Sequence, residues 1–148
     1  MANGGVLLVA TDFSPASDVA LDRAIDLARG LSAEIEVLHV HKVTTTSMPP
    51  TLDMVPIPPS SKEVSQGEEA LADRVARVRE AGVTCEGESR FGRPEDEIVR
   101  RAVERQARLI VLGSHGASTL RHVLLGSVTE SVLADSPCPL VVVPRPRT

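Results

Sequence analysis

Continuous apolar runs alternate along this chain with segments of helical periodicity. The first run is Val6–Ala10, and similar runs follow at 34–40, 109–112 and 140–143. The runs at 6–10, 109–112 and 140–143 are apolar at every position, whereas the run at 34–40 begins with alternation, at Glu34 and Glu36, and ends apolar. Continuous rather than alternating apolar residues predict strands buried on both faces. Such strands are typical of a parallel sheet covered by helices. A more polar run at 83–91, with Gly87 inside it, predicts a strand at the edge of the sheet.

The segments between the runs carry helix start signals. Ser14-Pro15 predicts a capped helix with proline in its first turn, and Ser60-x-x-Glu63 has the spacing of a capping box. A third helix is predicted from Gly92-Arg93-Pro94, with acidic residues first and arginines in its later turns, where the helix dipole favours them. Those arginines are Arg100, Arg101 and Arg105. The β-α alternation predicts an α/β fold, a doubly wound parallel sheet in a single domain spanning residues 1–148.

The longest break in this pattern lies at 41–59. It holds three consecutive threonines, five prolines and several apolar residues. Connections this long inside a domain are usually functional or mobile. The sequence leaves two readings open, a flap that packs partly on the domain and a disordered insertion.

The composition argues against several classes of function but adds little about the fold. The 148 residues carry a net charge of −4 and contain two phenylalanines but no tryptophan or tyrosine. This argues against nucleic-acid binding, which needs a basic surface and often aromatic stacking platforms. No apolar run approaches the roughly 20 residues of a membrane span. The two cysteines, Cys85 and Cys138, are too few for a disulfide framework, so we expect reduced thiols and a cytoplasmic protein.

The most informative stretch follows the 109–112 run. It contains Gly113-Ser114-His115-Gly116, nine further residues, and then Gly126-Ser127-Val128-Thr129, which we expect to open a fourth helix. Glycines after a buried strand let an anion approach the backbone, and a helix N-terminus adds partial positive charge. Ligands of open α/β sheets bind beyond the carboxyl ends of strands. If the first and fourth strands are neighbours, Thr11-Asp12 joins this stretch in one crevice.

Each of these residues also has a purely structural interpretation. The glycines could only make tight turns, and Ser127, with Glu130 at capping-box spacing, could only cap the fourth helix. Asp12 could contact an adenine amino group, a ribose hydroxyl or Mg²⁺, or it could only favour the start of a helix. His115 could donate to a phosphate or lie exposed in its loop, and Arg121 and His122 could screen phosphate charge or simply be solvated.

Other chemistries are poorly supported by the sequence. Neither lysine, Lys42 nor Lys62, lies near a glycine turn, so there is no Walker A loop, and the first strand does not lead into a dinucleotide fingerprint. His39 and His41 share one face of a strand, but no third metal ligand is evident. No catalytic nucleophile arrangement stands out. We therefore predict no catalytic residue and no metal site.

With these motifs in place, the chain resembles the universal stress protein family. The family's G-x2-G-x9-G-[ST] motif is matched in full by Gly113, Gly116, Gly126 and Ser127. The Thr11–Ser14 segment is similar to the family's D-x-S segment, and Leu38-His39-Val40 and Pro137–Val143 match as well. Phe13, where the family commonly has a small residue, is a departure.

The resemblance implies a five-stranded parallel sheet of order 3-2-1-4-5 with helices on both faces. It implies ATP as the ligand, with adenine near Asp12 and Val40. The ribose and inner phosphates would lie near the first glycine turn and the outer phosphates at the second, against Gly113, His115, Gly116, Gly126, Ser127, Val128 and Thr129. It also implies a homodimer formed through the last strand, Leu140–Val143, which is too apolar for an open edge.

Three functions remain open at this point. The first is an ATP-binding stress-response protein in which nucleotide occupancy orders the 41–59 segment and regulates binding of an unidentified protein partner. The second is a slow ATPase or phosphotransferase, which would need a base or a cation at the γ-phosphate; Arg121 is the one candidate cation. The third is a dimeric interaction protein that binds no nucleotide, which the intact glycine motif disfavours.

Overall fold

The computed structural model describes residues 4–48, 53–115 and 125–146. Within them a five-stranded parallel sheet has the order β5-β2-β1-β6-β7. This is the predicted order 3-2-1-4-5, renumbered because two further strands follow β2. The sheet strands are β1 (Val6–Ala10), β2 (Glu34–Lys42), β5 (Cys85–Gly92), β6 (Leu109–Gly113) and β7 (Leu140–Val143).

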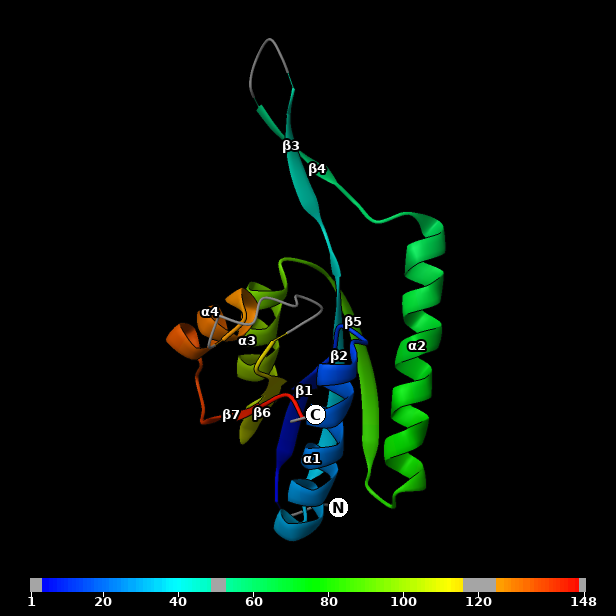
Figure 1. The fold of residues 1–148 in the computed structure, drawn as a ribbon, viewed down its shortest axis with the longest axis vertical. Helices are drawn as coiled ribbons and strands as arrows, with labels where there is room; N and C mark the ends of the chain where they lie inside the picture. Colours follow the sequence, from blue (N-terminus) through cyan, green and yellow to red (C-terminus); the bar gives the residue numbers. More distant parts are fainter. Residues whose placement is uncertain (1–3, 49–52, 116–124, 147–148) are drawn as a thin grey trace.

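Helices cover both faces of the sheet (Figure 1). Neighbouring residues of β1 point to opposite faces: Leu7 and Val9 pack with helices α1 and α2, whereas Leu8 packs with α3 and α4. Burial of both faces is what continuous apolar runs predict. The helices are α1 (Pro15–Leu31), α2 (Ser61–Glu80), α3 (Pro94–Arg105) and α4 (Ser127–Asp135).

The local start signals of α1 and α2 are confirmed. The Ser14 hydroxyl accepts a hydrogen bond from the Ser17 amide at 3.2 Å, and the Ser60 hydroxyl accepts one from the Glu63 amide, also at 3.2 Å. Each bond satisfies a backbone donor that the helix itself leaves unpaired. The predicted edge strand is also confirmed. Its Gly87 lies so close to α2 that an added Cβ would come within 2.9 Å of Val75 Cγ2.

Neither reading of the 41–59 segment was right. Residues of β3 (Thr44–Met48) and β4 (Asp53–Ile57) form an antiparallel hairpin, with Thr44 opposite Ile57. The hairpin projects beyond the end of the sheet (Figure 1) and leaves Met54 and Ile57 exposed instead of packing as a flap. The physical reason is that β-branched threonine, valine and isoleucine favour extended backbone.

A buried carboxylate ties α3 to the sheet. Glu36 of β2 is 1% exposed and faces α3, with Leu8 of β1 beside it. Arg101 binds it through two bonds, Nε to Oε1 at 2.5 Å and Nη2 to Oε2 at 2.9 Å, and Arg105 Nε approaches Oε2 at 3.1 Å. The Arg105 contact lacks the alignment of a hydrogen bond, so it acts as a charge contact only.

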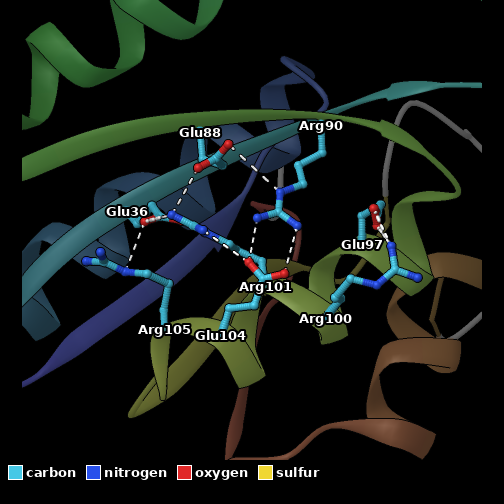
Figure 2. A network of polar contacts seen from close by, with 8 residues as sticks. All are labelled: Glu36, Glu88, Arg90, Glu97, Arg100, Arg101, Glu104 and Arg105. Carbon is cyan, nitrogen blue, oxygen red and sulfur yellow. Dashed lines mark hydrogen bonds and ion pairs between the residues drawn. The ribbon is translucent and has the colours of Figure 1, made fainter.

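The network extends to the edge strand (Figure 2). Arg101 Nη2 also lies 2.9 Å from Glu88 Oε2, and Arg90 of β5 donates to Glu104 of α3 at 3.0 Å. The hydrogen bond from Arg90 is the main reason that the pKa of Glu104 falls to about 2. Two of the arginines that the sequence suggested as dipole partners in α3, Arg101 and Arg105, therefore also neutralise carboxylates of the sheet, whereas Arg100 pairs with Glu97 of α3 itself.

Replacing Arg101 with methionine should destabilise the protein strongly. The substitution keeps much of the side chain's bulk but leaves the Glu36 carboxylate undercompensated in the interior, and breaking a buried pair costs about 3–5 kcal/mol. Arg93→Met is the matched control, because Arg93 pairs with Glu95 at 2.8 Å while its side chain is 71% exposed. There the loss should be at most about 1 kcal/mol. Urea unfolding measures both, and equal losses would contradict a special role for Glu36.

Candidate functional site

A cavity of about 530 Å³ lies at the carboxyl ends of β1, β2 and β6. These three strands are adjacent, with β1 in the middle. The chain winds outward from β1 in both directions, so this is the switch point at which open α/β sheets bind ligands. Nine of the ten residues predicted from the sequence line the cavity: Thr11, Asp12, Val40, Gly113, His115, Gly126, Ser127, Val128 and Thr129.

Three predicted residues fall outside the described part of the chain. They are Gly116, a member of the glycine motif, and the two candidate cations Arg121 and His122.

The turn between β1 and α1 is held by its own side chains. The Thr11 hydroxyl accepts a hydrogen bond from the Phe13 amide at 3.0 Å and lies 3.0 Å from the Ser17 hydroxyl. The Asp12 carboxylate accepts one from the Ser14 amide, also at 3.0 Å. Asp12 therefore shapes the start of α1, as its structural interpretation required, and it also lines the cavity. Its contact with a ligand remains a prediction.

The second wall of the cavity joins the end of β6 to the start of α4. The Thr129 hydroxyl, which is buried, donates to the Gly113 carbonyl at 2.9 Å, and the Gly126 amide donates to the Ser114 carbonyl at 2.7 Å. These bonds fix the first turn of α4 at the rim of the cavity. The amides of a helix's first turn have no partner inside the helix, so this rim suits an anion.

The predicted cap of α4 is wrong by one residue. Gly126, with φ −68° and ψ 159°, is the N-cap, and Ser127 is the first helical residue. No side chain makes a cap hydrogen bond at this helix, and the Glu130 amide donates to the Gly126 carbonyl instead. Ser127 is exposed and lines the cavity, and its hydroxyl makes no cap hydrogen bond.

His39 lies in the cavity wall with a defined tautomer. Its Nδ1–H donates to the Thr11 carbonyl at 2.9 Å, which leaves Nε2 as an acceptor in the neutral ring. Burial lowers the pKa of His39, and the charge of His41 lowers it further. The Thr11 hydrogen bond and the carboxylates of Asp12 and Glu68 oppose the shift.

The two histidines of β2 do not form a metal site in the described residues. His41 Nε2 lies 3.0 Å from Glu68 Oε1, and this hydrogen bond is the main reason that the pKa of Glu68 is lowered. No group of three histidine, cysteine or carboxylate ligands occurs in the described part of the chain. At the other wall, His115 Nδ1 lies 3.0 Å from the Ser114 hydroxyl.

The cavity also has walls that the sequence did not reveal. Lys42 lines it, although it is distant from every glycine turn in the sequence, because the end of β2 lies beside the end of β1. Helix α3 contributes Pro94 and Ile98, and Pro59 and Glu63 line the cavity near the start of α2. No local signal marks these residues. The one signal for Lys42 is its position two residues after Val40, a predicted site residue on the same strand.

Fold and cavity together define a doubly wound α/β protein with a ligand site at the switch point, bordered by a glycine-flanked strand end and a helix N-terminus. The sequence model of the Universal stress protein family matches residues 5–144. Universal stress protein YxiE of Bacillus subtilis is 38% identical over 143 residues, covering 93% of this chain and 97% of YxiE. The chain belongs to the universal stress protein family.

Solved structures agree with this assignment. Universal stress protein UspA from Lactobacillus plantarum matches with a TM-score of 0.80 and 26% identity, covering 97% of this chain and 99% of that one. A universal stress protein in complex with cAMP matches with a TM-score of 0.70 and 26% identity, covering 94% and 95%. Among the described residues, no helix is both long and apolar enough to span a membrane.

The lowered pKa of His39 makes stability depend on pH. Below the unfolded-state pKa of about 6.5, the unfolded chain takes up a proton that folded His39 resists, so acidification favours unfolding. We expect the free energy of unfolding to fall between pH 7.5 and pH 5.5, and to fall less in His39→Gln. Urea unfolding at the two pH values measures this, with His115→Gln as the control that keeps His39. The same pH dependence in His39→Gln and the wild type would contradict it.

Proposed function

We propose that the chain binds an adenine nucleotide, ATP in the first instance, in the cavity at the switch point. One observation carries the proposal: residues from four separate elements, chosen from the sequence for nucleotide binding, converge on one cavity. Its volume of about 530 Å³ lies within the range of small-molecule sites. The cAMP complex of a protein 26% identical to this chain supports the same class of ligand.

The proposed orientation follows from the polarity of the two walls. The phosphates lie at the start of α4, where the helix dipole and first-turn amides stabilise negative charge, with the Ser127 hydroxyl as a further donor. The base lies toward Asp12 and Val40, where the carboxylate accepts from an amino group or ribose hydroxyl. Mg²⁺ accompanying the phosphates is part of this proposal.

We infer binding rather than hydrolysis as the main activity. Hydrolysis needs a group that orients water at the terminal phosphate, together with a cation for the developing charge. Among the described residues, the carboxylates that line the cavity are Asp12, assigned to the base end, and Glu63 near the start of α2. Nucleotide occupancy then serves as a signal that regulates binding of a protein partner in a stress response.

The orientation predicts different effects for two substitutions. Ser127→Ala should weaken ATP binding about tenfold, the equivalent of about 1.4 kcal/mol for a charge-assisted hydrogen bond, and leave adenosine binding unchanged. Asp12→Asn should weaken the binding of both ATP and adenosine. Calorimetry measures the affinities, with Ser47→Ala on the distant hairpin as the control. The proposal fails if the wild-type chain binds neither ATP nor adenosine, and the orientation fails if Ser127→Ala weakens both equally.

We also propose a homodimer formed through β7. Leu140, Val141 and Val142 are only half-buried, although the four-residue strand carries no polar side chain and forms an edge of the sheet. An apolar edge strand exposes unpaired backbone groups and needs a cover, which the same strand of a second copy would supply.

The dimer should dissociate when a charge is placed in its centre. Val142→Lys should convert a dimer into a monomer of 15.7 kDa at micromolar concentration, because the ammonium groups of two copies would meet in an apolar interface. Light scattering measures the mass. Val103→Lys, at an exposed position of α3, is the control and should stay dimeric. A monomeric wild type would contradict the proposal.

A further inference from the structure

Phe13, the residue that departs from the family pattern, does not enter the cavity. It is absent from the cavity lining, whereas its neighbours Thr11 and Asp12 are part of it. Its φ of 65° lies in the left-handed region, which is unfavourable for a bulky side chain and costs about 1–3 kcal/mol. Such a conformation persists only where the surroundings hold it in place, so the contacts of Phe13 show what fixes this turn.

Two groups hold the Phe13 ring. The His39 ring lies against it with the centroids 4.2 Å apart, and the Arg74 guanidinium lies 5.1 Å from its centroid. Arg74 Nη2 also donates to the Phe13 carbonyl at 3.4 Å. Helix α2 therefore contacts both the side chain and the backbone of the turn.

Arg74 is itself fixed by α1. Its Nε donates to Asp18 Oδ1 at 3.0 Å and its Nη2 to Asp18 Oδ2 at 3.1 Å, a two-point contact that leaves little rotational freedom. Both side chains are partly buried, at 21% and 29% exposed. The guanidinium thus connects α1, α2 and the turn between β1 and α1.

The ring contacts continue along β2 from His39. The His39 and His41 centroids are 4.8 Å apart, and the His41 and Phe91 centroids are also 4.8 Å apart. Helix α2 closes over the two imidazoles at Gly67, where an added Cβ would come within 2.7 Å of His41 Cε1. Helix α2 is therefore coupled to His39 in two ways, through the Arg74–Phe13 contact and through the close approach of Gly67.

We propose that Arg74 is a positioning residue for the nucleotide site: by clamping Phe13 it fixes the turn that presents the Asp12 carboxylate to the cavity and, through the Phe13 ring, the orientation of the His39 ring of β2 in the cavity wall. Without Arg74 the strained Phe13 backbone relaxes, and both groups leave the geometry that suits a ligand. Because coupling between sites is reciprocal, nucleotide binding in turn stabilises the packing of α2 on this turn. This inference rests on the proposed nucleotide binding.

The chain supplies a matched control for the test. Arg77, on the next turn of α2, pairs with Asp22 of α1, so the same two helices share a second arginine–aspartate contact. That pair is more exposed, at 42% and 53%, and is distant from Phe13. Arg74→Met should weaken ATP binding about tenfold, whereas Arg77→Met should change it less than twofold. A double-mutant cycle completes the comparison: in a Phe13→Asn background, where asparagine tolerates positive φ, Arg74→Met should have little further effect.

A second readout does not depend on nucleotide. The chain has four histidines, so the His39 ring proton resonance can be assigned by comparison with His39→Gln. In the protein without nucleotide, Arg74→Met should shift this resonance because the Phe13 ring moves, Phe13→Asn should shift it because the ring is lost, and Arg77→Met should leave it unchanged. An unmoved resonance in Arg74→Met overturns the clamp, whatever the binding experiment gives. A moved resonance with unchanged ATP affinity overturns the positioning role, and a wild type that binds no ATP overturns the proposed function itself.

Discussion

The parallel pairing of β1 with β2 on one side and β6 on the other is the constraint on which the site depends. It places the ends of three strands at one edge, with Val9 opposite both Val37 and Val111. Because β1 is buried on both faces, its register cannot slip without moving apolar side chains to the wrong layer. The turn that follows β1 is consequently fixed beside the glycine-flanked end of β6, and the cavity forms between them.

Two arginine–carboxylate pairs, one on each face of the apolar sheet, hold helices against it. On one face, Glu36 receives the guanidinium of Arg101 and so orients α3 over the sheet. On the other, Asp18 receives Arg74 and holds α2 over the turn after β1. Neither pair is required for burial of apolar surface, and each instead fixes a helix in one position. The two pairs differ in burial, because Glu36 is almost fully enclosed and Asp18 is partly exposed. The greater burial makes the first pair the more important one for stability, and the proposed role of the second is to position the turn beside the cavity.

Nine of the twenty described residues that line the cavity were predicted, from local patterns and from the family resemblance. Strand ends next to glycine turns and the D-x-S segment marked residues such as Asp12, Gly113 and Ser127, and the five-stranded order placed them together. Ser127 is a residue for which the local pattern gave the wrong position in the helix. Its capping-box spacing predicted that Ser127 is the N-cap of α4. Gly126, however, is the extended residue that precedes the helix, so the N-cap lies one residue earlier. Lys42 is far from every glycine turn along the chain, but the parallel pairing of β1 with β2 brings it to the cavity wall.

Outside the 41–59 segment, the sequence by itself determined the element types, the helix starts at Ser14 and Ser60 and the burial of the central strands, because hydrophobic period and capping act over a few residues. Only the tertiary structure decided that Arg101 pairs with Glu36 of β2, because the two residues lie 65 positions apart in the chain. It likewise decided that Phe13 turns toward Arg74, 61 residues further on, and away from the cavity. A side chain with several acceptable environments takes the one that distant elements build around it, and no local pattern encodes that choice.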